Sequence, residues 1–202
     1  MRHVGLDLSL TGTGVVILGL DGEILFHGTY GESGHRDDPE RVKIERQIGI
    51  ASSVIRAIKA HGYDRDGWPD DLSPSEELAR MRVAEKPEVW IEQYSFGKRF
   101  KGQKSGSNAQ YELAELHGVV RSQLWLALGI AAEKRTASHV RKVVFGKGNT
   151  PKAQVPKLLA KGRVTTRTNW SGFEFPDGDQ ADAFVVAEAL RCKDHKKQEG
   201  LF

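Results

Sequence analysis

Cysteine is almost absent from this 202-residue sequence, which contains only Cys192. One thiol excludes an internal disulfide and a zinc site built from several cysteines, and it agrees with a reducing compartment. Because free cysteines commonly act as small packing residues, we expect this role for Cys192, late in a helix. The seven histidines show no metal-ligand spacing, and we expect His117 and His139 to be core or surface residues.

Long apolar runs are missing as well. No stretch approaches the roughly 20 apolar residues that a transmembrane helix requires, so we expect no membrane partner. The sequence passes from Met1 directly into an apolar strand pattern, without the basic segment, apolar core and cleavage site of a secretory signal. Together with the scarcity of cysteine, this predicts a cytoplasmic protein.

The net charge is small, +3, but the positive residues are unevenly distributed. A hydrophobic fraction of 39% and a charged fraction of 28% exclude general disorder, and the length suits one domain spanning 1–202. Two stretches concentrate the positive charge: Lys98, Arg99, Lys101 and Lys104, and Arg141, Lys142, Lys147 and Lys152. Such clusters favour a polyanionic partner, although solvated surface charges produce the same pattern.

Apolar periodicity predicts an α/β protein with a mixed five-stranded sheet flanked by helices. Three strand-like runs, VGLDLSL, VVILGL and ILFHGTY, predict an antiparallel meander in which Asp21-Gly22 is typical of a two-residue hairpin turn. The runs VWIEQYSF and IAAEKRTA predict two further strands. Helices are predicted over 38–61, 75–83 and 109–128 and within HVRKVVFG, TPKAQVPKLLAKG and DQADAFVVAEALRC.

Four segments carry more specific expectations. Residues 62–87 gather glycine, proline and acidic residues, which predicts a surface excursion, and 193–202 should be a charged, frayed tail. Helix 38–61 should pack on the sheet through Val42, Ile44, Ile48, Ile50, Val54, Ile55 and Ile58. Helix 109–128, with Ser107 or Asn108 as its N-cap, has a wide apolar face formed by Leu113, Leu116, Val120, Leu124 and Leu128.

Acidic residues interrupt two of the predicted central strands. Asp7 lies between Leu6 and Leu8, and Glu92 lies within VWIEQYSF. A charge in such a setting is costly unless it is paired or bound to a metal. The alternative for Asp7 is a side chain on a solvent-facing side of the sheet.

Asp179 and Asp182 lie three residues apart at the start of the last predicted helix, so they share one face. Taken alone, they are more typical of an N-cap and a first-turn acid stabilised by the helix dipole. With Asp7 and Glu92 they form a set of hard oxygen ligands, which Mg²⁺ and Mn²⁺ prefer. We therefore predict a site for two ions, bridged by Asp7, that is suited to phosphodiester hydrolysis.

At these residues the sequence resembles the RuvC-type Holliday junction resolvases, which have a ribonuclease H-like or integrase-like fold. The resemblance covers most of the chain and rests on VGLDLSLTGTG, WIEQYSF, VRKVVFGKGNTPKAQVPKLL and DQADAFVVAEAL, in that order. It implies a Mg²⁺-dependent endonuclease, with Mn²⁺ able to substitute, that cuts four-way junctions and other branched DNA. It also implies metal binding by Asp7, Glu92, Asp179 and Asp182, and assistance at the scissile phosphate by Lys152 and by Arg141 or Lys142.

The resemblance extends to the partners. Resolvases of this group act as homodimers because a four-way junction presents two symmetric strands, and helix 109–128 is the candidate interface. The family places a base-stacking aromatic near its catalytic glutamate, where this chain has Ser95 between Tyr94 and Phe96, with Phe100 as a further candidate. Segments 62–87 and 163–176 look like insertions relative to the bacterial members, which favours a phage origin and a bacterial or phage-infected host cell.

Other classes remain open at this point. The run GLDLSLTGTG also resembles the phosphate-binding hairpin of actin-like ATPases and sugar kinases, but those proteins need two such lobes. A junction-binding protein that does not cut needs only the basic surfaces. A transposase or integrase with the same fold would be expected to carry additional DNA-binding modules.

Overall fold

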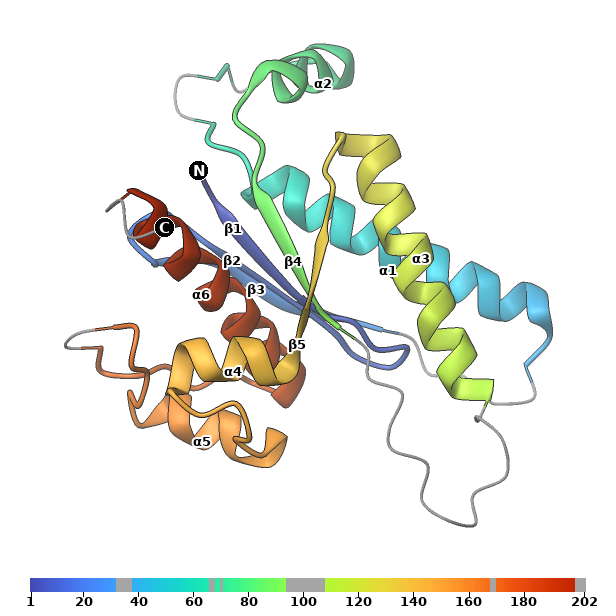
Figure 1. The fold of residues 1–202 in the computed structure, drawn as a ribbon. Coiled ribbons are helices and arrows are strands. Elements are labelled where there is room, and N and C mark those ends of the chain that lie inside the picture. The colour runs from blue at the N-terminus through green and yellow to red at the C-terminus, as the bar shows by residue number, and fades with distance from the viewer. Residues whose placement is uncertain (32–37, 66–67, 70, 94–107, 168–169, 199–202) are drawn as a thin grey trace.

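A mixed five-stranded sheet lies at the centre of the computed structural model (Figure 1), which describes residues 1–31, 38–65, 68–69, 71–93, 108–167 and 170–198. Its strands are β1 (His3–Asp7), β2 (Thr13–Leu18), β3 (Ile24–Tyr30), β4 (Glu88–Gln93) and β5 (Glu133–Thr136). The first three form an antiparallel meander, β4 pairs in parallel with β1, and β5 pairs in parallel with β4. The resulting order, β3-β2-β1-β4-β5, confirms the predicted α/β class and mixed sheet.

Helices cover both faces of this sheet (Figure 1). They are α1 (Glu40–His61), α2 (Pro74–Val83), α3 (Asn108–Leu128), α4 (Ala137–Phe145), the 3₁₀ helix η1 (Lys152–Gln154), α5 (Val155–Ala160) and α6 (Gly178–Gln198). Helix α6 lies on one face, α1 and α3 lie on the other, and α2 stands away from the sheet (Figure 1). Within the described ranges, no helix combines the length and the apolar character that a membrane span requires.

Side chains of β1 alternate between two hydrophobic cores, as the two-residue period of a strand requires. Val4 and Leu6 are fully buried with residues of α1 and α3, so Gly5 and Asp7 face α6. Asp7 is only 7% exposed. The alternative that its side chain lies on a solvent-facing side of the sheet is therefore wrong.

Glycines bring α6 into direct contact with the first hairpin. A Cβ atom on Gly5 would lie 2.1 Å from the carbonyl oxygen of Ala183, and one on Gly14 would lie 2.0 Å from the carbonyl oxygen of Asp179. Real Cβ atoms do not approach backbone so closely, so any side chain at either position would push the helix away. The close contact places the first turn of α6 over the end of β1.

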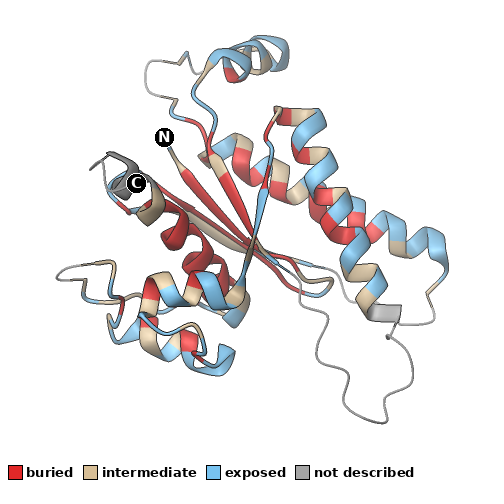
Figure 2. Cartoon of the chain, viewed as in Figure 1, coloured by how far each residue is buried: buried red, intermediate tan, exposed pale blue. Residues whose placement is uncertain are grey.

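The N-terminal half of α1 departs from the prediction. Its neighbour is α3 and not the sheet, and Arg46 is buried there in ion pairs with Asp38 and Glu112. Apolar periodicity could not show that this part of the helix would lack an apolar neighbour. Three residues assigned to the core consequently remain 43–47% exposed, as Figure 2 shows for this end of the helix: Val42, Ile44 and Ile48.

The turn between β2 and β3 is longer than the predicted two-residue turn. Gly22 has the positive φ, 86°, that the Asp-Gly pair suggested. However, its N–H donates to the carbonyl oxygen of Gly19 at 3.1 Å, so Gly22 closes a β-turn over residues 19–22. The loop is therefore one residue longer than a two-residue turn, and a shift in the β2–β3 register between Ile17 and Leu18 compensates for this difference.

Helix boundaries also differ in places. The excursion over 62–87 contains α2, which starts one residue earlier than predicted because Ser73 and Glu76 form a capping box. The helix predicted after Pro151 is divided into η1 and α5. Helix α6 continues to Gln198, into the expected tail, and α3 starts at Asn108, whereas Ser107 lies outside the described residues.

The contact between Gly5 and α6 generates a stability prediction. Gly5→Ala forces the helix away from β1 and should lower the free energy of unfolding by about 1–3 kcal/mol. Ser52→Ala, on the exposed side of α1, is the control; better helix propensity should raise stability by about 0.5 kcal/mol. Urea unfolding measures both. A loss of the same size in both variants would contradict the assigned contact.

Candidate functional site

Two central strands, β1 and β4, each carry a carboxylate near the C-terminal end. Asp7 is the last residue of β1, and the parallel register pairs Leu6 with Ile91, so Glu92 lies beside Asp7. Both alternate with residues of the α1 and α3 core, and both therefore face α6. The Asp7 and Glu92 side chains are 11% and 15% exposed.

Helix α6 brings the other two carboxylates. Asp177 caps this helix, because its Oδ1 atom accepts the backbone N–H of Gln180 at 2.8 Å. The simpler interpretation of Asp179 as the N-cap is therefore wrong, and its side chain is available to the site. Asp182, one turn later, is 1% exposed and points toward the same place.

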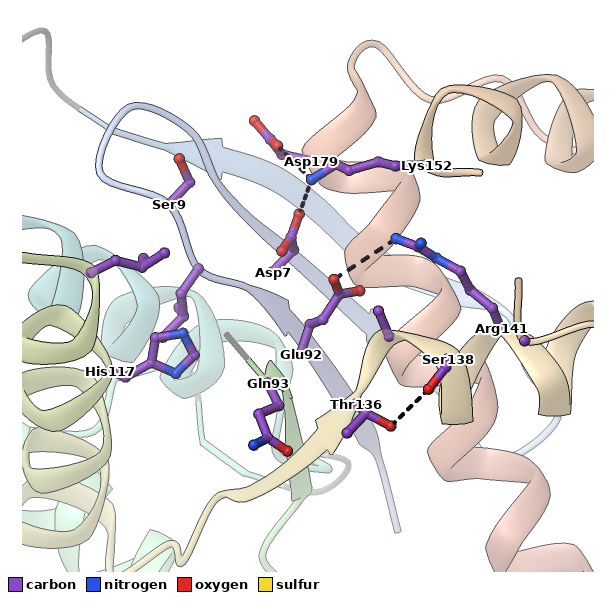
Figure 3. A pocket seen from close by; sticks show the side chains of 14 residues that line it. Asp7, Ser9, Glu92, Gln93, His117, Thr136, Ser138, Arg141, Lys152 and Asp179 are labelled. Atoms are coloured by element: carbon purple, nitrogen blue, oxygen red, sulfur yellow. Dashed lines mark hydrogen bonds and ion pairs between the residues drawn. The ribbon is translucent and has the colours of Figure 1, made fainter. Parts of the chain in front are cut away.

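Two cationic side chains lie among these acids (Figure 3). Lys152 Nζ is 2.9 Å from Asp7 Oδ2, 3.1 Å from Asp182 Oδ2 and 3.7 Å from Asp179 Oδ1. Arg141 Nη2 is 3.4 Å from Asp182 Oδ1 and 3.8 Å from Glu92 Oε1, and its Nη1 donates to the Thr150 carbonyl oxygen at 3.3 Å. Four acids thus share two cations.

The remaining negative charge is visible in the pKa values. Burial raises the pKa of Asp7 to about 6, although the Lys152 ammonium opposes the increase. Burial, together with the charges of Asp7 and Asp182, raises the pKa of Glu92 to about 7. For Lys152, burial lowers the pKa, but the carboxylates of Asp7 and Asp182 outweigh it and the net shift is upward. Burial and repulsion between carboxylates thus raise the pKa values of Asp7 and Glu92 more than the two cations lower them. An additional cation would stabilise the ionised forms.

The donor set fits a hard divalent cation. Among the described residues, the buried Glu92 Oε2 has no hydrogen-bond partner, and the buried Asp182 Oδ2 is met by the Lys152 ammonium at 3.1 Å. Buried carboxylate oxygens of this kind require a partner, and oxygen is the ligand that Mg²⁺ and Mn²⁺ prefer. Among the described side chains, however, no three acids, histidines or cysteines are already arranged around a common metal position.

Three of the four acids, Asp7, Glu92 and Asp179, line a cleft of about 890 Å³ together with Arg141 and Lys152 (Figure 3). Asp182 is buried and meets the same two cations. One wall comes from α3, through Leu113 and His117, and the other comes from α4 and η1. Burial lowers the pKa of His117 to about 4, with help from Lys134 and Arg121, so this wall is neutral. Sequence reasoning missed the cleft-lining hydroxyl groups, for which no sequence signal exists: Ser9, Thr136 and Ser138.

The predicted DNA-contacting residues fall into three groups. Lys142 and Lys147 are exposed. Arg141 and Lys152 turn inward to the acidic cluster, so each is an internal counter-charge as well as a candidate phosphate contact. The third group lies outside the described residues: the aromatic candidates Tyr94, Phe96 and Phe100, and the basic residues Lys98, Arg99, Lys101 and Lys104.

Two further residues at the start of α6 were missed. Asp177 caps the helix, and Gln180 donates to Asp177 Oδ2 at 2.9 Å. Burial raises the pKa of Asp177, but hydrogen bonds from Thr29 and Gln180 outweigh it and the net shift is downward. An acid followed three residues later by glutamine, before an apolar run, is close to a capping-box pattern. That pattern could have identified Asp177 as the cap.

Cys192 and His139 lie away from this cleft. Cys192 is late in α6, as predicted, and its thiol donates to Glu188 Oε1 at 3.8 Å. Burial and the Glu188 charge raise its pKa to about 11, so the group is an unreactive thiol. His139 packs near the ring of Trp90.

Comparisons with known proteins define the fold. No protein-family model matches the sequence, and no curated protein matches it. Among solved structures, Thermus thermophilus RuvC matches with a TM-score of 0.62 and 16% sequence identity, over 99% of this chain and 97% of that one. T. thermophilus RuvC in complex with a Holliday junction substrate matches with a TM-score of 0.61 and 14% identity, over 96% and 95%. The chain therefore has the fold of the RuvC-type Holliday junction resolvases.

The raised pKa of Glu92 predicts a pH-dependent stability change. Ionisation of Glu92 opposes folding, because its pKa is 4.5 ordinarily and about 7 in the folded protein. The cost is absent below pH 4.5, grows up to pH 7 and is then constant. In EDTA, Glu92→Gln should therefore be more stable than the wild type at pH 8, by about 1–3 kcal/mol, and equally stable near pH 4. Thermal unfolding at both pH values measures the difference.

The control is Glu88→Gln, on the same strand but one-third exposed in a pair with Lys193. It should show no gain at the higher pH. A destabilised Glu92→Gln variant at pH 8 without divalent ions would contradict the excess of negative charge at the site.

Proposed function

We propose that this protein is a divalent-cation-dependent endonuclease that resolves Holliday junctions and acts on other branched DNA. The observation that carries the proposal is the convergence of Asp7, Glu92, Asp179 and Asp182 around Lys152 and Arg141, beside a cleft in a RuvC fold. Each carboxylate has another explanation when taken alone. Together, with only Lys152 and Arg141 as described counter-charges, they form a site that needs additional cations.

The four carboxylates would hold two Mg²⁺ or Mn²⁺ ions. When bound, the ions acidify a water molecule and stabilise charge at the phosphodiester that is cut. Lys152 is well placed to contact the scissile phosphate, because its ammonium lies at the opening of the acidic cluster and its side chain is 54% exposed. A compact ammonium suits a single phosphate oxygen. Arg141, which is 11% exposed, orients Glu92 and Asp182.

DNA is the substrate that the charge and the fold favour. Lys142 and Lys147 are exposed near the cleft wall that α4 provides, and the basic stretch 98–104 follows directly after β4 in the chain. Exposed lysines attract the phosphates of the DNA backbone by charge, whatever the base sequence of the DNA. A RuvC structure with the same fold is a complex with a Holliday junction substrate, and we extend that substrate class to this chain.

The competing functions lack comparable support. An actin-like ATPase or sugar kinase requires two similar lobes, whereas the described residues contain a single five-stranded sheet. A junction-binding protein that does not cut would have no use for buried carboxylates near a DNA surface, where they repel phosphate. The acidic cluster therefore favours cleavage.

We further propose a homodimer that uses the outer face of α3. The apolar residues on which the sequence prediction rested, such as Leu116 and Leu124, are buried in the protein's own core. Among the described residues, a different face is exposed: the small residues Ala114, Gly118 and Ser122, spaced four apart, lie between Tyr111 and Trp125, which are 62% and 60% exposed. Aromatic residues are enriched at protein–protein interfaces, and the small side chains between these two leave room for a partner to approach.

Loss of cleavage in Asp7→Asn tests the proposed chemistry. The variant should bind a four-way junction in EDTA as the wild type does, but it should show no cleavage in Mg²⁺ or Mn²⁺, because one charged ligand is lost. Asp21→Asn, at the exposed β2–β3 turn, is the matched control and should cut normally. Wild-type cleavage rates in Asp7→Asn would refute the assignment.

The substrate class requires its own experiment. End-labelled four-way, three-way, flap and linear duplex DNA should be incubated with and without Mg²⁺ or Mn²⁺. We expect paired symmetric nicks in the four-way junction and no cutting of linear duplex. Equal cutting of the linear duplex would show a general nuclease.

The α3 face can be tested by adding a large charge to it. Gly118→Arg should convert the dimer to a monomer at micromolar concentration, whereas the monomer fold should tolerate the change because nothing lies within 4 Å of a Cβ atom there. Ser52→Arg, on the exposed side of α1, is the control and should remain dimeric. Solution scattering measures both. A monomeric wild type would refute this part of the proposal.

A further inference from the structure

Four side chains from separate parts of the chain meet at the first turn of α6. His27 and Thr29 come from β3, the outermost strand of the meander, while Asp177 lies two residues before Asp179 and Gln180 directly follows it. Gln180 is 6% exposed, so its amide group needs partners within the protein. We refer to these four residues as the α6 clamp.

Hydrogen bonds in the α6 clamp have definite directions. Gln180 Nε2 donates to Thr29 Oγ1 at 3.0 Å and to Asp177 Oδ2 at 2.9 Å. Thr29 Oγ1 donates to Asp177 Oδ2 at 2.6 Å, and Gln180 Oε1 lies 2.6 Å from His27 Nδ1, which donates to it. Both amide hydrogens of Gln180 and the hydroxyl hydrogen of Thr29 are therefore used. Because each of these hydrogen atoms has one acceptor, the hydrogen-bond network favours a single conformation of the four side chains.

The clamp surrounds a predicted metal ligand. Asp179 lies between the two clamp residues of α6, and on its other side it meets the glycines of the first hairpin. A Cβ atom on Gly14 would lie 2.0 Å from the carbonyl oxygen of Asp179, and one on Gly12 would lie 2.3 Å from its Oδ2 atom. The hairpin thus prevents movement of Asp179 toward the sheet, and the clamp ties the same turn to β3.

Aromatic residues before α6 hold the clamp in place. The ring of His27 makes edge contacts with Phe173 and Phe175, at centroid distances of 5.4 and 5.8 Å. These phenylalanines belong to the segment 163–176, which we interpreted from the sequence as an insertion relative to the bacterial members. The segment therefore supports the turn that carries Asp179 and Asp182.

We propose that His27, Thr29, Asp177 and Gln180 are positioning residues that set the divalent-cation affinity of the site through Asp179. The proposal rests on the metal-dependent function proposed above. Outer hydrogen bonds that orient ligands commonly change metal affinity by about 10–100-fold when they are removed. The clamp does so through the backbone of one helix turn, and none of its members needs to contact the metal or the DNA.

The chain offers a matched pair of threonines for the test. Thr29 donates to Asp177 at the start of α6, and Thr166 donates to Glu188 Oε1 at 2.7 Å near the middle of the helix. Thr29→Val and Thr166→Val each remove a hydroxyl that donates to a carboxylate without changing the side-chain shape, and Thr29→Val also removes the acceptor of the Gln180 amide. Only the first of these bonds lies at the metal site, so a general effect on α6 stability would appear in both variants.

Calorimetric titration with Mn²⁺ separates the possibilities. Thr29→Val should raise the Mn²⁺ dissociation constant about tenfold, Thr29→Ser should restore it, and Thr166→Val should retain the wild-type value. Wild-type affinity in Thr29→Val, or an equal loss in both valine variants, would overturn the positioning role and leave the proposed function intact. Absence of saturable Mn²⁺ binding to the wild-type protein would overturn the proposed function itself.

Discussion

Repulsion among four carboxylates is the constraint on which the rest of the site depends. Buried acids are costly, and their cost increases when they lie close together. Burial is the largest cause of the raised pKa values of Asp7 and Glu92; neighbouring carboxylates add to the increase, and Lys152 and, at Glu92, Arg141 oppose it. The fold must therefore supply the stability that keeps these groups together until cations complete the site.

Helix α6 provides most of that support because a long continuous part of it belongs to the core. Residues 181–190 are all buried, and glycines in β1 and β2 allow the helix to contact the sheet backbone. Near the middle of the helix, the buried Glu188 carboxylate accepts hydrogen bonds from Arg167 at 2.7 Å and Arg191 at 2.8 Å. Burial alone would raise the pKa of Glu188, but these bonds from the two arginines outweigh it and lower that pKa. The helix is thus held at its first turn by the glycine contacts and near its middle by the two arginines. The first turn also carries Asp179 and Asp182, the candidate metal ligands.

Several features were predictable because they depend on local pattern. The strand meander, the parallel strand with Glu92 and the long last helix follow from apolar periodicity, and the order of acidic motifs pointed to the RuvC fold despite an identity of 14–16% with solved members of it. The exposed half of α1 was wrongly assigned because periodicity shows that a helix has an apolar face but not which neighbour covers it. The predicted length of the turn at Gly22 was wrong because an Asp-Gly pair fits more than one type of hairpin turn.

The sequence by itself determined which chemical groups the protein has and the order in which they occur: four acids in strand and helix contexts, two basic stretches and glycines in the first hairpin. Only the tertiary structure decided that Asp177, and not Asp179, caps α6, that Arg141 turns inward, and that β3 reaches the same helix turn through Thr29. These outcomes depend on contacts between residues up to about 150 positions apart. Such contacts leave no periodic signal, because the distance between two elements is set by how closely their backbones pack.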